Sequence, residues 1–488
     1  MRRAGPCLAL FLLTTPAHAS EDAANPLAPV LAVVEEIQTE PGMIHASIGF
    51  AALSVSTQNA APAAGYRPDA AMIPASTLKL VTTATGLETL GPDFTFKTHL
   101  QYTGSLSPDG ALEGNVIIKG GGDPTLGASR IINTFAPWKD ALDESGINAI
   151  HGQIVGDASI FGTQLRPDSW QWNHIGNYFA AGACGLTFHQ NLFSATFQTG
   201  SSGSPAPLLH TDPKLPGIEF INEMQVGPAG SGDQGYIFGS AYANLLYLRG
   251  TLPAGRSSFT IKGSLPDPAF FCARAFTKYL NDQNLTVSSN PNTVRLLNIA
   301  GETLPARTTI FTQESDPLSS LIVLTNHKSN NLSAECIHRM IGYKASGKGT
   351  TTAAAKATID YWSARGIDTS GFAMADGCGL SRVNTMTARQ LTKLLKHMIH
   401  SENAKPFYAS IPIAGQSGTL RSIGRGTPSE GNVHAKSGTL NRVKCYAGYA
   451  NTRSGNQYAF TLFINNHDCT DTQIVAKIVR VWNALVTL

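Results

Sequence analysis

The chain has 488 residues, of which 42% are hydrophobic and 14% charged, and its formal net charge is +3. This composition is typical of a soluble globular protein, and the length leaves room for two to four domains. The nearly balanced charge argues against nucleic acid or an anionic membrane as the main partner.

Residues 1–19 have the pattern of a secretory signal peptide. Two arginines, an apolar run over residues 7–13 and the cleavage pattern Ala17-His18-Ala19 follow one another in the expected order. The run is too short to span a bilayer, and no later stretch of about 18 unbroken apolar residues would anchor the chain. We therefore expect a periplasmic or extracellular protein without a transmembrane anchor; a buried N-terminal helix is the alternative.

Helix and strand patterns open the mature chain. An apolar stripe predicts a helix over residues 25–38 with Asn25 as its N-cap, and a strand pattern follows over 45–56. Residues 57–71 are rich in Ala and Pro and are expected to form a loop. The next helix is predicted to begin near Ser76 and to end at a Gly-Pro pair.

Ser76 and Lys79 form the pattern S-x-x-K, and Ser76 is the one serine followed by lysine at i+3. Positions i and i+3 share a helical face, so the hydroxyl lies beside the amine. A serine hydroxyl becomes a nucleophile when a neighbouring base takes its proton, and a lysine can be that base if its surroundings keep it neutral. Taken alone, the pattern also fits an ordinary capped helix with an exposed lysine.

Residues 93–310 form a β-rich block that carries no catalytic pattern of its own. Short strand patterns alternate with Gly/Pro/Asp turns, for example at 96–100, 115–119, 153–157 and 257–262. A helix is predicted over 268–283. The three glycines 120–122 lack the Gly-Lys-Ser/Thr that would follow in a phosphate-binding loop, so we interpret them as a turn.

The remainder is first helical and then β. Helices are predicted over 318–325, from 332 onward, over 352–365 and over 387–400, and strands over 431–440, 444–451 and 457–465. A last helix covers about 472–488. Its polar face is not rich in Lys or Arg, which favours packing in a core over binding to a membrane.

Two further motifs follow Ser76 and Lys79 in the chain. Ser329-Asn330-Asn331 is an S-x-N that lies in a turn between two predicted helices, and Lys436-Ser437-Gly438 is the one K-[ST]-G of the chain. Glycine lets a substrate backbone approach the strand closely, and a lysine with a hydroxyl suits a carboxylate. Each motif alone also fits a capped turn or an edge-strand lysine, but the three in this order are hard to obtain by chance.

Six cysteines remain after the predicted cleavage: Cys184, Cys272, Cys336, Cys378, Cys445 and Cys469. Export permits disulfides, yet six cysteines allow 15 pairings, and free buried thiols are the alternative. No C-x-x-C or H-E-x-x-H occurs, so the sequence gives no support for a metal, and no organic cofactor is implied.

The order S-x-x-K, S-x-N, K-[ST]-G is the signature set of penicillin-binding proteins and serine β-lactamases. From about residue 30 onward the chain closely resembles one branch, the class C low-molecular-mass penicillin-binding proteins, which are D-alanyl-D-alanine carboxypeptidase/endopeptidases. The resemblance lies in the long insertion after Lys79 and in the segments 74–79, 121–126, 376–382 and 434–439.

The resemblance implies an α+β fold: a transpeptidase-like domain, with a five-stranded antiparallel sheet flanked by helices and an all-helical lobe, that carries a β-rich two-domain insertion. The implied division is a catalytic domain over 20–92 and 311–488, an inserted domain over 93–181 and 264–310, and a second domain nested in it over 182–263. Trp170, Trp172 and Tyr178 occupy the stretch that contacts the substrate side chain in relatives; a place in an inserted-domain core is the alternative.

The resemblance also implies a reaction on peptidoglycan stem peptides. Ser76 would be the acylated nucleophile, Lys79 its base, and Ser329 would relay the proton to the leaving amine. Release of the terminal D-Ala makes a carboxypeptidase, and the same step on a cross-link makes an endopeptidase. β-Lactams would trap Ser76 as a long-lived ester.

Four more residues would bind the substrate. Asn331 would hold a peptide amide, while Lys436, Ser437 and Thr439 would hold the terminal carboxylate, with Lys436 also helping to keep Lys79 neutral. The backbone N–H groups of Ser76 and Thr439 would form the oxyanion hole.

Three positions depart from the usual family pattern. Asn330 stands where aspartate is common, Ser437 replaces threonine but keeps a hydroxyl, and Cys378 stands where serine is usual. We interpret Cys378 as a structural replacement, because no base is evident beside it; a reactive thiol is the alternative. Two other functions stay open: a β-lactamase or esterase, for which we find no deacylating glutamate, and a non-catalytic cell-wall binding protein.

Overall fold

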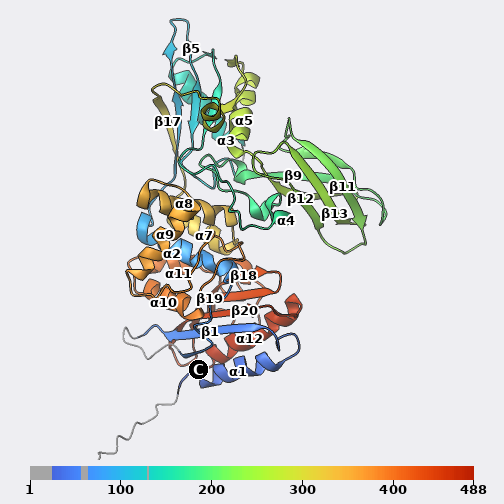
Figure 1. The fold of residues 1–488 in the computed structure, drawn as a ribbon, viewed down its shortest axis with the longest axis vertical. Helices are drawn as coiled ribbons and strands as arrows, with labels where there is room; N and C mark the ends of the chain where they lie inside the picture. Colours follow the sequence, from blue (N-terminus) through green and yellow to red (C-terminus); the bar gives the residue numbers. More distant parts are fainter. Residues whose placement is uncertain (1–24, 57–63, 129–130) are drawn as a thin grey trace, which may run out of the picture.

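The computed structural model describes residues 25–56, 64–128 and 131–488, so the predicted signal peptide lies outside the described residues. The red and blue strands in the lower half of Figure 1 form a five-stranded antiparallel sheet in the order β18-β19-β20-β1-β2. Its strands are β1 (Ser47–Ser54), β2 (Ala64–Tyr66), β18 (Val433–Leu440), β19 (Val443–Asn451) and β20 (Gln457–Asn465).

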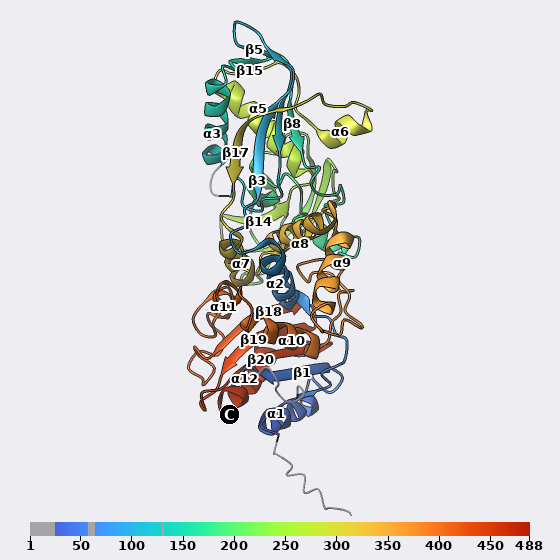
Figure 2. The same ribbon diagram turned by 90° about the vertical axis from the view of Figure 1, so that its left-hand side faces the viewer.

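Helices cover both faces of this sheet. On one face α1 (Ala28–Thr39) packs against α12 (Asp471–Val486), and on the other α10 (Ala388–Ile399) crosses β1 and β20 (Figure 2). Ile474, Ile478, Trp482 and Leu485 of α12 are buried, which confirms the prediction that the last helix packs in a core.

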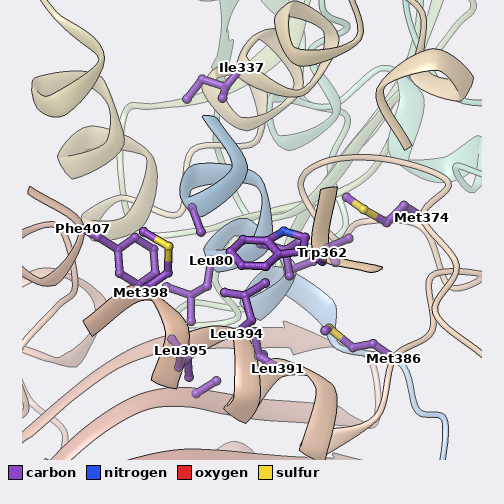
Figure 3. Close-up of a cluster of buried hydrophobic side chains, with 14 of the residues drawn as sticks. Leu80, Ile337, Trp362, Met374, Met386, Leu391, Leu394, Leu395, Met398 and Phe407 are labelled. Atoms are coloured by element: carbon purple, nitrogen blue, oxygen red, sulfur yellow. The ribbon is translucent and has the colours of Figure 1, made fainter. Parts of the chain in front are cut away.

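The all-helical lobe surrounds α2 (Leu78–Leu90), whose residues 78–87 are all buried. A helix buried on every side serves as a rigid support for the residues at its start. Figure 3 shows Leu80 of α2 among side chains from several other helices, including Ile337, Trp362 and Leu394. The lobe also contains α7 (Leu318–His327), α8 (Asn331–Ser346), α9 (Thr351–Ser363) and α11 (Ala404–Ala409).

The insertion forms the upper part of Figure 1. Its first portion has a five-stranded sheet, β16-β8-β6-β3-β17, and a four-stranded sheet, β15-β7-β5-β4. The strands are β3 (Lys97–Tyr102), β4 (Ser105–Leu106), β5 (Ala111–Glu113), β6 (Val116–Lys119), β7 (Ala149–Ile150), β8 (Ile154–Asp157), β15 (Thr286–Val287), β16 (Asn292–Thr293) and β17 (Thr308–Glu314), and the helices are α3 (Ile131–Glu144), α5 (Pro268–Asp282) and α6 (Val294–Ile299).

The second portion of the insertion projects to one side of the molecule (Figure 1). It consists of two three-stranded sheets, β10-β9-β14 and β11-β13-β12. The elements are α4 (Trp172–Ile175), β9 (Leu192–Gln198), β10 (Leu208–Asp212), β11 (Glu219–Gly227), β12 (Gln234–Phe238), β13 (Leu245–Pro253) and β14 (Ser258–Ser264). Residues of the two sheets share one apolar cluster, so this portion has a core of its own.

Four details differ from the sequence-based expectations. Part of the predicted loop over 57–71 is strand β2, which pairs with β1. The first helix begins at Ala28 rather than after Asn25, whose side chain instead accepts from the Leu27 N–H at 3.1 Å. Helix α3 escaped prediction because Pro137 lies inside it, where proline normally argues against a helix. The sheet of the insertion continues past the expected boundary at 310, because β17 pairs with β3 as far as residue 314.

The structure also bears on disulfide pairing and on membrane-spanning helices. All six cysteines of the described residues are unpaired thiols, and all but Cys469 are buried. None of the helices in the described part of the chain is both long and apolar enough to cross a bilayer.

Candidate active site

Ser76 lies in the 3-10 turn η1 (Ala75–Thr77) that leads into the buried helix α2. Two glycines allow neighbouring segments to approach this turn. A Cβ on Gly438 of β18 would lie 2.9 Å from Ser76 N, and one on Gly379 would lie 1.9 Å from Ala75 O. Because these are backbone atoms, a side chain at either position would force the two segments apart, so glycine is favoured at both. The close approach at Gly438 places strand β18 directly beside the serine.

Lys79 occupies the centre of the site. Its Nζ lies 3.0 Å from Ser76 Oγ, 2.6 Å from Asn331 Oδ1 and 2.7 Å from the Cys378 carbonyl oxygen. Burial lowers the pKa of the Lys79 amine, which has no exposed surface. A neutral amine that donates to Asn331 and to the carbonyl keeps its lone pair for the Ser76 proton.

Lys436 forms a second network beside the first. Its Nζ lies 3.0 Å from Ser329 Oγ and 2.7 Å from the Ser437 carbonyl oxygen. Burial, together with the nearby amine of Lys79, holds the pKa of Lys436 well below its ordinary value. The Ser437 hydroxyl lies 2.8 Å from Thr419 Oγ1, so a second hydroxyl orients it.

The turn between α7 and α8 presents Ser329 and Asn331. Ser329 has a φ of +53°, a left-handed conformation that is uncommon for residues other than glycine. Asn330 caps α8 by accepting from the Ser333 N–H at 2.8 Å, so this side chain stabilises the start of the helix. The Asn331 amide nitrogen donates to the Phe179 carbonyl at 2.6 Å, which ties the insertion to the site.

The structure therefore joins most of the residues that the three motifs singled out. Ser76, Lys79 and Asn331 share one hydrogen-bond network, and Ser329, Lys436 and Ser437 share the other. Thr439 lies on β18 two residues beyond Ser437 with an exposed side chain. Within the described part of the chain, no side-chain hydrogen bond joins Thr439 to either network.

The loop over 376–382 contacts Lys79 through the Cys378 carbonyl and is itself held by hydrogen bonds to α2 and α8. Gly377 N–H donates to Glu335 Oε1 at 2.8 Å, and the Gly377 carbonyl accepts from Thr82 of α2 at 2.6 Å. Burial raises the pKa of the Cys378 thiol well above its ordinary value, so the thiol stays protonated. What Cys378 supplies to the site is its carbonyl, as expected for a structural replacement rather than a reactive thiol.

Glu335, Asp376 and Cys378 place their potential ligand atoms within 4.8 Å of one another. Asp376 Oδ1 accepts from Gly379 N and Asn384 Nδ2, and Oδ2 accepts from Ser381 N and from Trp170 Nε1. Both oxygens of this carboxylate are thus occupied by donors, which does not suit a metal ligand.

The three clustered aromatic residues have different surroundings. Trp170 is buried and donates to Asp376 at 2.8 Å, and it packs with Cys378 and Leu380 of the catalytic part rather than in a core of the insertion. Trp172 is exposed and packs on Phe238, whereas Tyr178 is 56% exposed and stacks edge-on against Phe179, next to the site.

Sequence reasoning missed three contributors. Thr419 lies in the turn η4 (Gly418–Leu420) and carries no recognisable motif. Phe179 acts through its carbonyl, which any residue type could supply. Glu335 could have been noticed, because it lies among the apolar residues of α8, and an acidic side chain is rarely buried unless it has a partner.

The chain is similar to known proteins along most of its length. The family model of the D-Ala-D-Ala carboxypeptidase 3 (S13) family matches residues 30–485. The chain is 30% identical to a D-alanyl-D-alanine carboxypeptidase of Actinomadura sp. strain R39, over 81% of this chain and 74% of the relative. It is 24% identical to the D-alanyl-D-alanine carboxypeptidase DacB of Haemophilus influenzae, over 88% of each chain.

The fold also matches a solved structure. The crystal structure of penicillin binding protein 4 (dacB) from Haemophilus influenzae superimposes with a TM-score of 0.78 at 22% identity, covering 94% of this chain and 99% of that chain. The match confirms the predicted α+β fold. From the family model and the similarity to the Actinomadura enzyme, we conclude that this chain belongs to the D-Ala-D-Ala carboxypeptidase 3 (S13) family of serine peptidases.

Proposed function

We propose that this enzyme removes the terminal D-Ala from peptidoglycan stem peptides through an acyl-enzyme on Ser76. The observation that carries the proposal is the position of the Lys79 amine, 3.0 Å from Ser76 Oγ and 2.6 Å from Asn331 Oδ1. A base buried next to a nucleophile, and itself oriented by a third group, is the usual arrangement for activating a serine.

In the first step Lys79 takes the proton of Ser76, and Oγ attacks the carbonyl carbon of the penultimate D-Ala. The backbone N–H groups of Ser76 and Thr439 would receive the developing oxyanion. Gly438 supports this assignment, because its lack of a side chain brings β18 within reach of the Ser76 backbone. Asn331 would hold a peptide amide of the substrate.

Collapse of the tetrahedral intermediate breaks the C–N bond, and the leaving amine takes a proton through Ser329, which lies 3.0 Å from Lys436 Nζ. Lys436, Ser437 and Thr439 would bind the terminal carboxylate, with Thr419 holding the Ser437 hydroxyl in place. Water then hydrolyses the ester of Ser76 and releases the shortened peptide. When the leaving amine belongs to a second stem peptide, the same steps make the enzyme an endopeptidase.

Two readouts test the nucleophile. Release of D-Ala from a D-Ala-D-Ala pentapeptide should fall roughly 10³-fold or more in Ser76→Ala and Lys79→Ala, because members of such a unit act together. After treatment with penicillin, mass spectrometry should find a covalent adduct on the wild type and on the control Ser202→Ala, an exposed serine. An adduct that persists unchanged in Ser76→Ala would overturn the assignment.

Nitrocefin turnover and the D-Ala release assay separate the other candidate functions. Rapid turnover of nitrocefin over many cycles would indicate a β-lactamase instead. Failure of the wild type to release D-Ala would indicate a cell-wall binding protein. We also propose export through the predicted signal peptide, which N-terminal sequencing of the mature protein, expected to start at Ser20, would test.

A further inference from the structure

A cavity of about 460 Å³ lies between the Ser329 turn and the nested portion of the insertion. Lys328, Ser329 and Asn331 line one side, and Tyr178, Gln190 and Lys262 are among the residues on the other. The cavity therefore begins at Ser329, the residue proposed to pass a proton to the leaving amine, and at Asn331, which is proposed to hold a peptide amide of the substrate. Its far wall comes from β14 and the turn before β9, which belong to a different part of the chain.

We propose that this cavity binds the leaving strand of a cross-linked stem peptide, an acidic peptide, with Lys262 as a specificity-determining residue. The inference rests on the proposed function, because the side of the leaving group is identified by the role of Ser329. A single leaving D-Ala needs little room, whereas pockets of about 300–1,000 Å³ accommodate much larger ligands. The bond that breaks and the proton transfers are those of the acylation described above, with the amine of the second strand as leaving group.

The charges at the rim suit a peptide that carries free carboxylates. Lys262 and Lys328 both line the cavity with exposed side chains. Among the described residues neither lysine has an ion-pair partner, so both ammonium groups are available to a ligand. Asp233 also lines the cavity and would repel one carboxylate or accept from a backbone N–H.

The backbone on both sides of the cavity is held in unusual conformations. Ser329 has a φ of +53°, and the turn η3 (His189–Asn191) has three successive residues with φ between +53° and +55°. The Asn191 side chain fixes this turn by accepting from Phe188 N at 3.0 Å and donating to the Gly182 carbonyl at 2.8 Å. Backbone conformations of this kind are energetically unfavourable and tend to occur at ligand sites.

Tyr178 adds an exposed aromatic surface between the catalytic turn and the cavity. Its ring is 56% exposed and is supported edge-on by Phe179, with 5.4 Å between ring centroids. The Phe179 carbonyl in turn accepts from Asn331. A bound peptide that contacts Tyr178 would therefore be connected to Asn331 through a single residue, Phe179.

The test compares two substrates on the purified mature enzyme: a D-Ala-D-Ala pentapeptide monomer and a cross-linked peptide dimer. The readout is the ratio of kcat/KM for the dimer to kcat/KM for the monomer. We expect Lys262→Glu to lower this ratio about tenfold and Lys262→Ala about threefold, with substantial recovery in Lys262→Arg. Added salt screens exposed charges, so it should lower the dimer-to-monomer ratio of the wild type and bring the ratios of the Lys262 variants closer to it.

Lys214→Glu is the matched control, because Lys214 is an exposed lysine of the same portion that does not line the cavity. It should leave the ratio unchanged. An unchanged ratio in Lys262→Glu, or an equal fall in Lys214→Glu, would overturn the inference. A wild type that hydrolyses the monomer but not the dimer would overturn it too, while leaving the carboxypeptidase proposal intact. Loss of both the monomer reaction and the penicillin adduct would instead refute the proposed function.

Discussion

Lys79 Nζ lies 2.6 Å from Asn331 Oδ1, although 252 positions separate the two residues in the chain. The contact joins the start of the central helix α2 to the first residue of α8. Since Asn331 also donates to the Phe179 carbonyl, its amide oxygen must face the lysine. A neutral acceptor at this position orients the amine without adding a negative charge that would favour its protonated form.

Replacing Asn331 with aspartate tests that arrangement. A carboxylate beside Lys79 raises the pKa of the amine, so less of the neutral base is present at pH 7 and acylation by penicillin should slow about tenfold or more. The acid limb of the rate profile should move to higher pH, and activity should recover partly in alkaline buffer.

Asn331→Ala is the control for this prediction. It removes the same contacts but adds no charge, so it should slow acylation without moving the acid limb upward. Equal pH profiles for the two variants would contradict the electrostatic explanation.

The buried Glu335 carboxyl should make stability depend on pH. Burial raises its pKa to about 7, from an ordinary value of 4.5. Between these values the folded state binds more protons than the unfolded state, so the free energy of unfolding falls as pH rises through this window, by about 3 kcal/mol in all. Above about pH 7 the loss is complete, because the carboxyl is then ionised in both states.

Glu335→Gln should remove this dependence while keeping an oxygen to accept from Gly377 N–H. Urea titrations at pH 5 and pH 8 measure the effect: the difference in unfolding free energy between the two pH values should shrink in the variant. A difference as large as in the wild type would assign the pH dependence to other groups.

Gly438→Ala should disturb the site through contact between backbones. The added Cβ would lie 2.9 Å from both Pro74 O and Ser76 N, so strand β18 must move away from the serine turn. We expect a loss of roughly 1–3 kcal/mol of stability and a fall in the rate of penicillin acylation. Gly200→Ala is the control, because its Cβ would meet only a side-chain oxygen at 3.4 Å; acylation equal in both variants would argue against a close role for β18.

The Cys378 thiol should be unreactive in the native enzyme. It is buried with a raised pKa, and Cys469 is the one partly exposed cysteine among the described residues. A thiol reagent should therefore label Cys469 alone before denaturation and leave D-Ala release unchanged, and Cys469→Ser should abolish that labelling. Native labelling of Cys378 accompanied by loss of activity would support the alternative of a reactive thiol.

The sequence predicted most elements of the catalytic part because their signals are local. The stripe of α12 and the strand patterns that became β18, β19 and β20 need only the apolar periodicity of the chain itself. The motifs S-x-x-K, S-x-N and K-[ST]-G are likewise local, and their order along the chain indicated the resemblance to penicillin-binding proteins. Short β2 and the proline-containing α3 were missed, because pairing with β1 and packing in the insertion outweigh their local preferences.

What the sequence determined by itself is the identity of the reacting groups and their order along the chain. Only the tertiary structure decided which groups touch: that Lys79 contacts Asn331 and the Cys378 carbonyl, that Thr419 supports Ser437, and that the nested portion borders a cavity beside Ser329. The physical reason is that a hydrogen bond depends on distances of about 3 Å, and here these are set by the packing of segments from 18 to 299 residues apart, for which no local pattern carries a signal.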